Sequence, residues 1–266
     1  IQSCCRLIAF KRSDHLALVA AGSGNRFVML REGYLEFLTP TADTRIAQQL
    51  RTAIQRYTGL HLIAFGSADA EADHARLDKN GFTPLPTVAL QRQIGTEQGE
   101  ETARFSVVRV PPGTMAEGRI QYCQQHTPQW LWQERWTAHA NGARGLAAVI
   151  ICVADPQEAA QRYARFTGLL AQLGNGQWRI NTQRGALLFV TPEQLQSALG
   201  LRAPALPWIA GYVLTSDDLA LTRNRLKAGG CNTRELDATH LLLEWPNALG
   251  GLVIFQSAGA ALHPLT

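Results

Sequence analysis

The stretch GLHLIAFGSADAEADHARLDKNGF, residues 59–82, contains one strand, one turn and one helix in a single run. An apolar segment that begins at Leu60 predicts a strand, Asp69 is placed to cap a helix, and Gly81 ends the helical pattern. His61 interrupts the otherwise apolar strand. The stretch therefore raises two questions: whether this plan recurs along the chain, and what the histidine does.

The same plan recurs twice downstream. Residues 146–155 and 208–215 are further apolar runs of strand length, and each is followed by a helical pattern that ends at glycine. In the second copy a proline at the first helical position and a glutamate two residues later strengthen the prediction of a helix start. The predicted cap and stop residues are Asp155 and Gly168 in the second copy, and Ser216 and Gly229 in the third.

Further strands follow each predicted helix. They cover residues 83–94, 105–110 and 118–125 in the first copy, 177–181 and 186–190 in the second, which is shorter, and 231–237, 239–245 and 251–256 in the third. Upstream, residues 25–30 and 33–38 read as the last two strands of a fourth, incomplete copy, joined to the next by a helix over 43–57. A strand around His15 would open this copy but leaves no room for its helix. We therefore predict an α+β protein built from βαβββ units.

Composition excludes several classes of function. The 266 residues are 46% hydrophobic, and the formal charge of +4 comes from scattered arginines rather than from a basic stripe, so we expect no nucleic-acid partner. No apolar run reaches the length of a membrane span, and the start is not a signal peptide, so we expect a cytoplasmic protein. The five cysteines are scattered, without paired spacing, and predict neither a disulfide framework nor a zinc site.

Several segments together resemble the glyoxalase-like domain proteins of the vicinal oxygen chelate (glyoxalase/bleomycin resistance/dioxygenase) superfamily. The residues that carry the resemblance are Gly24–Asn25 with Tyr34–Phe37, Gly118–Trp132, His139–Ala143 and Leu249–Phe255. The resemblance implies repeated βαβββ units whose curled mixed sheets form clefts. It divides the chain into an amino-terminal pair of units, residues 1–141, whose first unit is incomplete, and a carboxyl-terminal pair, residues 142–266.

In superfamily members that use a metal, the first and last strands of each unit supply the ligands. The positions that match here are Glu36, His61 and Gln121, and His15 is the candidate for a fourth ligand. Such a nitrogen and oxygen set suits manganese, iron, nickel, cobalt or zinc and leaves positions open for a substrate with two adjacent oxygens. The resemblance thus implies a metal-dependent lyase or isomerase, or a dioxygenase-like enzyme. The carboxyl-terminal strands offer no such ligands.

Other residues add candidates and alternatives. His126 precedes Thr-Pro at the end of a strand, and with Glu36 it is a candidate for proton transfer. Trp130 and Trp132 are candidates for the wall of a substrate pocket. The alternative to a metal enzyme is a metal-free protein that binds or sequesters a small molecule. In that case His61 is a hydrogen-bonded strand residue, and Glu36 is solvated on the strand face opposite to Leu35 and Phe37. A dimerisation role for the carboxyl-terminal half is compatible with either.

Overall fold

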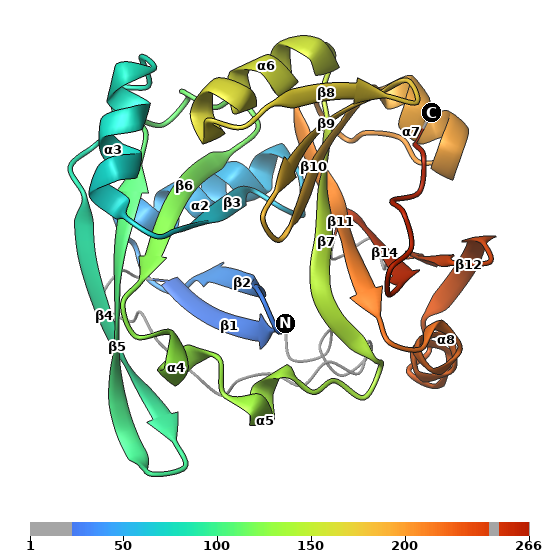
Figure 1. The fold of residues 1–266 in the computed structure, drawn as a ribbon, viewed down its shortest axis with the longest axis horizontal. Helices are drawn as coiled ribbons and strands as arrows, with labels where there is room; N and C mark the ends of the chain where they lie inside the picture. Colours follow the sequence, from blue (N-terminus) through green and yellow to red (C-terminus); the bar gives the residue numbers. More distant parts are fainter. Residues whose placement is uncertain (1–22, 245–249, 266) are drawn as a thin grey trace.

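The computed structural model describes residues 23–244 and 250–265. The predicted strand around His15, together with Cys4 and Cys5, lies outside these residues. The described chain is a mixed α+β structure with a four-stranded sheet on one side, a curled eight-stranded sheet on the other, and a short hairpin between them (Figure 1). The predicted fold class is confirmed. None of the described helices is long and apolar enough to cross a membrane.

The eight-stranded sheet contains two βαβββ units side by side. In each unit the first strand pairs in parallel with the last, β7 with β10 and β11 with β14, and β7 pairs with β11 in antiparallel register where the units meet. The first unit comprises β7 (Ala143–Cys152), α6 (Pro156–Thr167), β8 (Ala171–Gly174), β9 (Gln177–Thr182) and β10 (Gly185–Val190), and α7 (Pro192–Leu199) follows it. The second comprises β11 (Trp208–Ser216), α8 (Leu219–Ala228), β12 (Asn232–Asp237), β13 (His240–Glu244) and β14 (Leu252–Ser257).

The four-stranded sheet is the second unit of the amino-terminal half. Its order is β3-β6-β5-β4, again with the first and last strands parallel. The unit comprises β3 (Leu62–Ser67), α3 (Ala70–Lys79), β4 (Val88–Thr96), β5 (Gly99–Arg109) and β6 (Arg119–Gln125), and the short helices α4 (Pro128–Leu131) and α5 (Glu134–Thr137) follow it. The incomplete unit upstream contributes the antiparallel hairpin of β1 (Ser23–Met29) and β2 (Tyr34–Pro40), and α2 (Arg45–Arg56) joins it to β3.

Local signals set most helix starts. The side chains of Asp69 and Asp155 each accept hydrogen bonds from two backbone N–H groups of the first turn, as predicted. The third prediction was wrong: Ser216 ends β11, and Asp218 caps α8. The second copy is also longer than predicted, since β8 gives it three strands after its helix.

The two halves share one hydrophobic core. The side chain of Phe166 on α6 stacks on Tyr122 of β6 with ring centroids 5.5 Å apart and meets Phe82 edge-on at 5.1 Å. Beside this contact, Arg162 of α6 binds the buried carboxylate of Glu117 through two hydrogen bonds of 2.8 and 3.0 Å. Helix α6 of the carboxyl-terminal half therefore packs beside α3 against Tyr122 and Phe82 of the amino-terminal half. The division into domains at residue 141 stays a prediction.

Candidate cleft of the amino-terminal half

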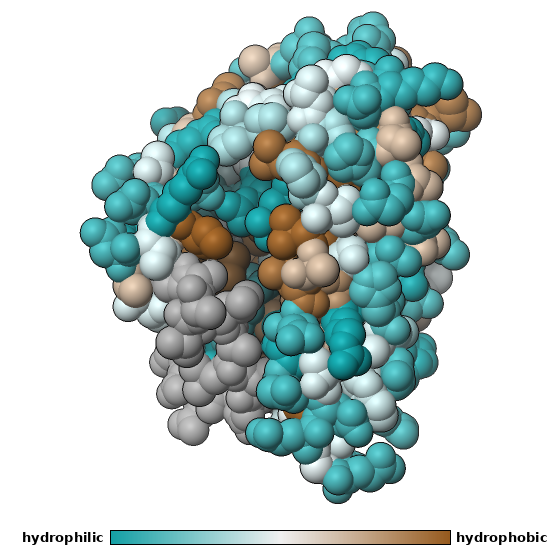
Figure 2. Space-filling view, turned by 90° about the vertical axis from the view of Figure 1, so that its left-hand side faces the viewer, coloured by the Kyte–Doolittle hydropathy of each residue, from teal (hydrophilic) through white to brown (hydrophobic). Residues whose placement is uncertain are grey.

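A cleft lies between the β1–β2 hairpin and the four-stranded sheet, and apolar side chains gather around a hollow on this side of the molecule (Figure 2). Strand alternation decides which residues of the sheet face it. Ile63, Phe65 and Tyr122 point to the shared core, so their neighbours on β3 and β6 point the other way. The neighbours include Leu62, Ala64, Gly66, Arg119, Gln121 and Cys123, and all of these except Gln121 line the cleft.

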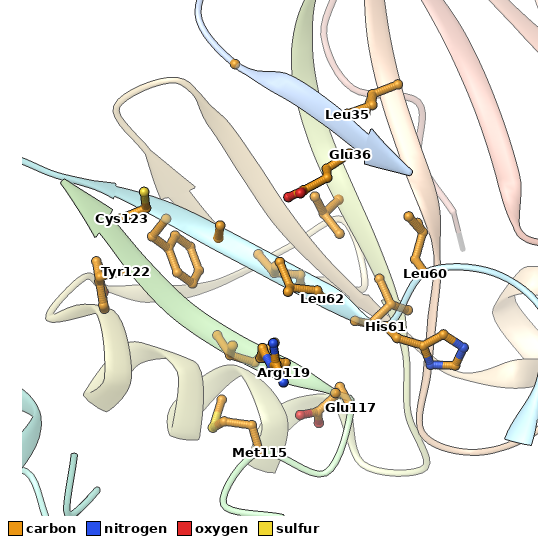
Figure 3. A pocket seen from close by; sticks show the side chains of 18 of the residues that line it. Leu35, Glu36, Leu60, His61, Leu62, Met115, Glu117, Arg119, Tyr122 and Cys123 are labelled. Carbon is orange, nitrogen blue, oxygen red and sulfur yellow. The ribbon is translucent and has the colours of Figure 1, made fainter. Parts of the chain in front are cut away.

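Glu36 points from the hairpin toward this sheet (Figure 3). Its neighbours Leu35 and Phe37 pack on the carboxyl-terminal sheet, and Glu36 lies on the opposite face of β2. That face borders the cleft. Glu36 is therefore not on an open surface, although its neighbours Leu35 and Phe37 lie in the core. The Nδ2 atom of Asn25, a residue only 2% exposed, donates a 2.8 Å hydrogen bond to Oε1 of Glu36.

The surroundings of Glu36 favour its neutral form. Burial raises the pKa of this carboxyl above its ordinary value, and the hydrogen bond from Asn25 and the charges of Arg92 and Arg119 oppose that shift only in part. Burial likewise raises the pKa of the Cys123 thiol to about 11. Glu36 can therefore hold or accept a proton, whereas Cys123 is a neutral thiol.

Arginines provide most of the charge in this region. Arg92 of β4 lies between two rings, with its guanidinium carbon 4.5 Å from the ring centroid of Phe27 and 5.1 Å from that of Phe105. Arg119 donates a 2.7 Å hydrogen bond from Nη2 to Gln49 on α2. Arg109 of β5 is paired across the strands with Gln121. Burial lowers the pKa of all three guanidinium groups.

Several buried polar atoms here have no hydrogen-bond partner within the described residues. They are Nε and Nη1 of Arg92, Nε of Arg109, and the Oε1 atoms of Gln121 and Gln125. Buried polar groups are normally paired, so such a group of atoms calls for an explanation. Of these residues, Arg109 and Gln125 line the cleft and are placed to meet a bound molecule.

His61 has a structural position. It precedes β3 rather than lying within it, and its ring points away from Glu36 (Figure 3). Its Nε2 atom is 2.8 Å from the carbonyl oxygen of Tyr57, and the two rings stack with centroids 4.2 Å apart. Its own carbonyl oxygen accepts a hydrogen bond from the backbone N–H of Arg119. The His61 side chain thus contacts Tyr57 at the end of α2, and its backbone contacts the first residue of β6.

The described residues do not fit a divalent metal ion. The charged groups that act on Glu36 are guanidinium groups, which repel a cation, and the ring nitrogen of His61 is directed at a carbonyl oxygen. No group of three His, Cys, Asp or Glu side chains within residues 23–244 and 250–265 could hold a metal. His61 is thus directed away from Glu36, His15 lies outside the described residues, and the metal set of Glu36, His61 and Gln121 stays a prediction.

The remaining sequence candidates are divided. His126 is exposed, and its Nε2 atom is 2.8 Å from Oγ of Ser106, on the outer side of the sheet. Trp130 does not line the cleft. Trp132 does, and its ring lies 6.1 Å from that of Tyr34 while its Nε1 donates to the carbonyl of Leu30. Of these three, only Trp132 is placed to contact a ligand.

None of the cleft arginines was predicted as a site residue, although the sequence contains one signal for them. Arg119, Gln121 and Cys123 alternate along one predicted strand, which places them on one face. Charged and polar side chains at these alternate positions indicate a polar face. The alternation did not show that this face lies inside the molecule, because that depends on the hairpin packed against it.

Comparisons with known proteins support the fold. Residues 2–167 match the family described as glyoxalase-like domain. None of the curated proteins matches the chain. A hypothetical protein from Staphylococcus aureus has a similar structure, with a TM-score of 0.64 at 8% identity over 93% of this chain and 90% of that one.

Two enzyme structures are also similar. A fusion protein of a xylose isomerase-like TIM barrel and 4-hydroxyphenylpyruvate dioxygenase gives a TM-score of 0.61 at 14% identity, over 98% of this chain and 47% of that one. A triple mutant of 4-hydroxymandelate synthase from Streptomyces coelicolor gives 0.57 at 14% identity, over 98% and 90%. At these identities the likeness concerns the fold alone.

Proposed function

The chain belongs to the glyoxalase-like domain family of the vicinal oxygen chelate superfamily, and we propose that it binds a small organic molecule in its amino-terminal cleft through its own side chains. One observation carries the proposal. A half-buried carboxylate, Glu36, faces a sheet on which buried polar atoms of arginine and glutamine have no partner within the described residues. Concave sites with a few convergent polar groups are typical of ligand binding.

The proposal favours recognition without a metal. Arginine side chains supply the positive charge near Glu36 that a metal ion would otherwise supply. Side chains of the cleft can also form hydrogen bonds to a ligand without a metal between them. A ligand with an apolar body would contact Leu62, Tyr34 and Trp132, which line the same cleft. Its polar atoms would pair with Arg109 and Gln125, the unpartnered residues that line the cleft.

A second candidate function is proton transfer by Glu36. A carboxyl whose pKa is raised by burial is suited to exchange a proton with a bound molecule. The test is the exchange of a carbon-bound proton of a cleft ligand with deuterium from D2O, followed by NMR. The expected result is exchange with the native protein and none with Glu36→Gln. Equal exchange with both proteins would contradict this role.

The binding proposal is tested by blocking the cleft. Ala64 is exposed in the cleft and is paired with Gln121, so Ala64→Phe would place a bulky ring at this point of the cleft without removing a polar group. A collection of small organic acids, bases and neutral compounds is screened by thermal shift, and hits are measured by calorimetry. We expect hits that bind the native protein and are lost in Ala64→Phe.

The matched control is Ala89→Phe. Ala89 is exposed on β4 and is paired with Ser106, on the outer face of the same sheet. The Ala89→Phe variant should still bind every compound that binds the native protein. Hits that survive Ala64→Phe, or a screen without hits, would overturn the proposal. Elemental mass spectrometry of the purified protein tests the metal alternative, since a full equivalent of transition metal would contradict recognition by side chains alone.

A further inference from the structure

The acidic and basic groups of the cleft are not in balance. Two acidic residues at its wall are already paired, Glu117 with Arg162 and Asp73 with Arg76. Glu32 is exposed in the hairpin turn, which leaves Glu36 as the acidic residue nearest to Arg92, Arg109 and Arg119. Within residues 23–244 and 250–265, none of these three guanidinium groups forms an ion pair with a carboxylate. A neutral ligand would leave this excess of positive charge without a counterion.

Two of the arginines are placed to act together. Arg109 and Arg119 line the cleft on the neighbouring strands β5 and β6, and they are close enough that Arg109 lowers the pKa of Arg119, after the larger effect of burial. They are diagonal neighbours on one face of the sheet, because Arg109 is paired with Gln121 and Arg119 lies two residues before Gln121 on β6. Like charges held near each other in a partly buried site are stabilised by an anion between them.

The groups around the pair are already ordered. Gln49 on α2 accepts the 2.7 Å hydrogen bond from the Arg119 guanidinium, while Nε of Arg109 has no partner in the part of the chain that the structure describes. Guanidinium groups match carboxylate and phosphate oxygens with paired hydrogen bonds. Arg92 differs, because two rings enclose it and it does not line the cleft. It serves to join the hairpin to the sheet.

Apolar residues surround the pair. Leu62 is the cross-strand partner of Arg119, and Val107, Phe105 and Leu90 form a small apolar cluster further along the same face. We infer that Arg109 and Arg119 bind the carboxylate or phosphate group of an organic anion whose apolar body lies along Leu62 and the hairpin. This inference rests on the proposed function and names its ligand class.

The experiment compares three probes that share one apolar body. Phenylacetate, phenyl phosphate and the neutral phenylacetamide are titrated into the full chain by calorimetry at low and high salt. We expect one or both anions to bind, weakening as salt rises, and the amide to bind at least about tenfold less tightly. The stronger of the two anions identifies the acidic group.

Variants locate the charge. Arg109→Met and Arg119→Met should each weaken the anion by about tenfold to a hundredfold and leave the amide unchanged. Arg109→Lys keeps the charge but removes the paired N–H donors of the guanidinium, so its affinity for the anion should lie between those of the native protein and Arg109→Met. The matched control is Arg104→Met, which removes the same charge from the exposed face of β5 and should leave the affinity for the anion unchanged.

The outcomes separate the inference from the proposed function. If the amide binds as tightly as the anions and Ala64→Phe blocks it, the cleft binds small molecules but the anion inference is wrong. If Arg104→Met weakens the anion as much as Arg109→Met does, the effect is one of overall charge and the assigned pair is wrong. If Ala64→Phe blocks no compound of the screen and none of these probes, the proposed function fails as well.

Discussion

Replacing Arg162 with methionine should strongly destabilise the protein. The carboxylate of Glu117 is only 1% exposed, and the Arg162 side chain, 15% exposed, gives it two hydrogen bonds of 2.8 and 3.0 Å. Arg162→Met removes the cation and leaves the carboxylate buried with only the hydroxyl of Tyr163, 3.4 Å away. Breaking a buried pair from one side costs about 3–5 kcal/mol. At roughly 2 °C per kcal/mol for a chain of this size, Tm should fall by roughly 6–10 °C.

Urea unfolding followed by circular dichroism and tryptophan fluorescence measures this loss. Arg162 also binds Glu158, but that side chain is 55% exposed, so Glu158→Gln should cost no more than about 1 kcal/mol. Replacing both partners, Glu117→Met with Arg162→Met, should recover most of the stability because no charge stays buried. A loss below about 1 kcal/mol for Arg162→Met alone would refute the reasoning.

Three further predictions concern the cleft and its border. Burial raises the pKa of Glu36, so ionisation of this carboxyl lowers the stability of the protein as the pH rises above 4.5. Glu36→Gln should therefore raise Tm at neutral pH and leave Tm unchanged below the ordinary carboxyl pKa. An equal change in Tm at the two pH values would contradict the raised pKa. Gly118→Ala should destabilise by several kcal/mol, since its Cβ would lie 2.4 Å from the carbonyl oxygen of His61, whereas Gly66→Ala on the same sheet meets nothing within 4 Å and serves as the control in urea unfolding. His61→Ala should cost about 1–3 kcal/mol through its lost contacts with Tyr57, and a stability within about 0.5 kcal/mol of the native protein would show that these contacts contribute little.

Short-range signals predicted most of the fold. The caps at Asp69 and Asp155 and the apolar runs of the first strands depend on residues close in sequence, so they can be read directly. Strand β8 was missed because it is a four-residue edge strand without alternation, preceded by Leu170, which is 80% exposed. In the third unit three consecutive polar residues, 216–218, could cap the helix, and only the backbone path shows that Asp218 does so.

The site was predictable only in part. Alternation correctly separated Glu36 from Leu35, but it could not say that both faces of the hairpin are covered. His61 fits a ligand position by its place in the repeat, yet the ring direction depends on Tyr57, which α2 delivers from outside that repeat. The role of Arg109 required the pairing of β5 with β6, which no local pattern contains.

The core shared by the two halves also constrains how the protein is made. Ile63, Phe82 and Tyr122 leave the ribosome well before Tyr163 and Phe166, the residues that cover them. Until α6 is synthesised, α3 alone packs on this face of the amino-terminal sheet, and the apolar side chains that Tyr163 and Phe166 contact lack these partners. A nascent chain in that state is a substrate for chaperones and a risk for aggregation. The junction that stabilises the finished protein thus makes its first half dependent on the second during translation.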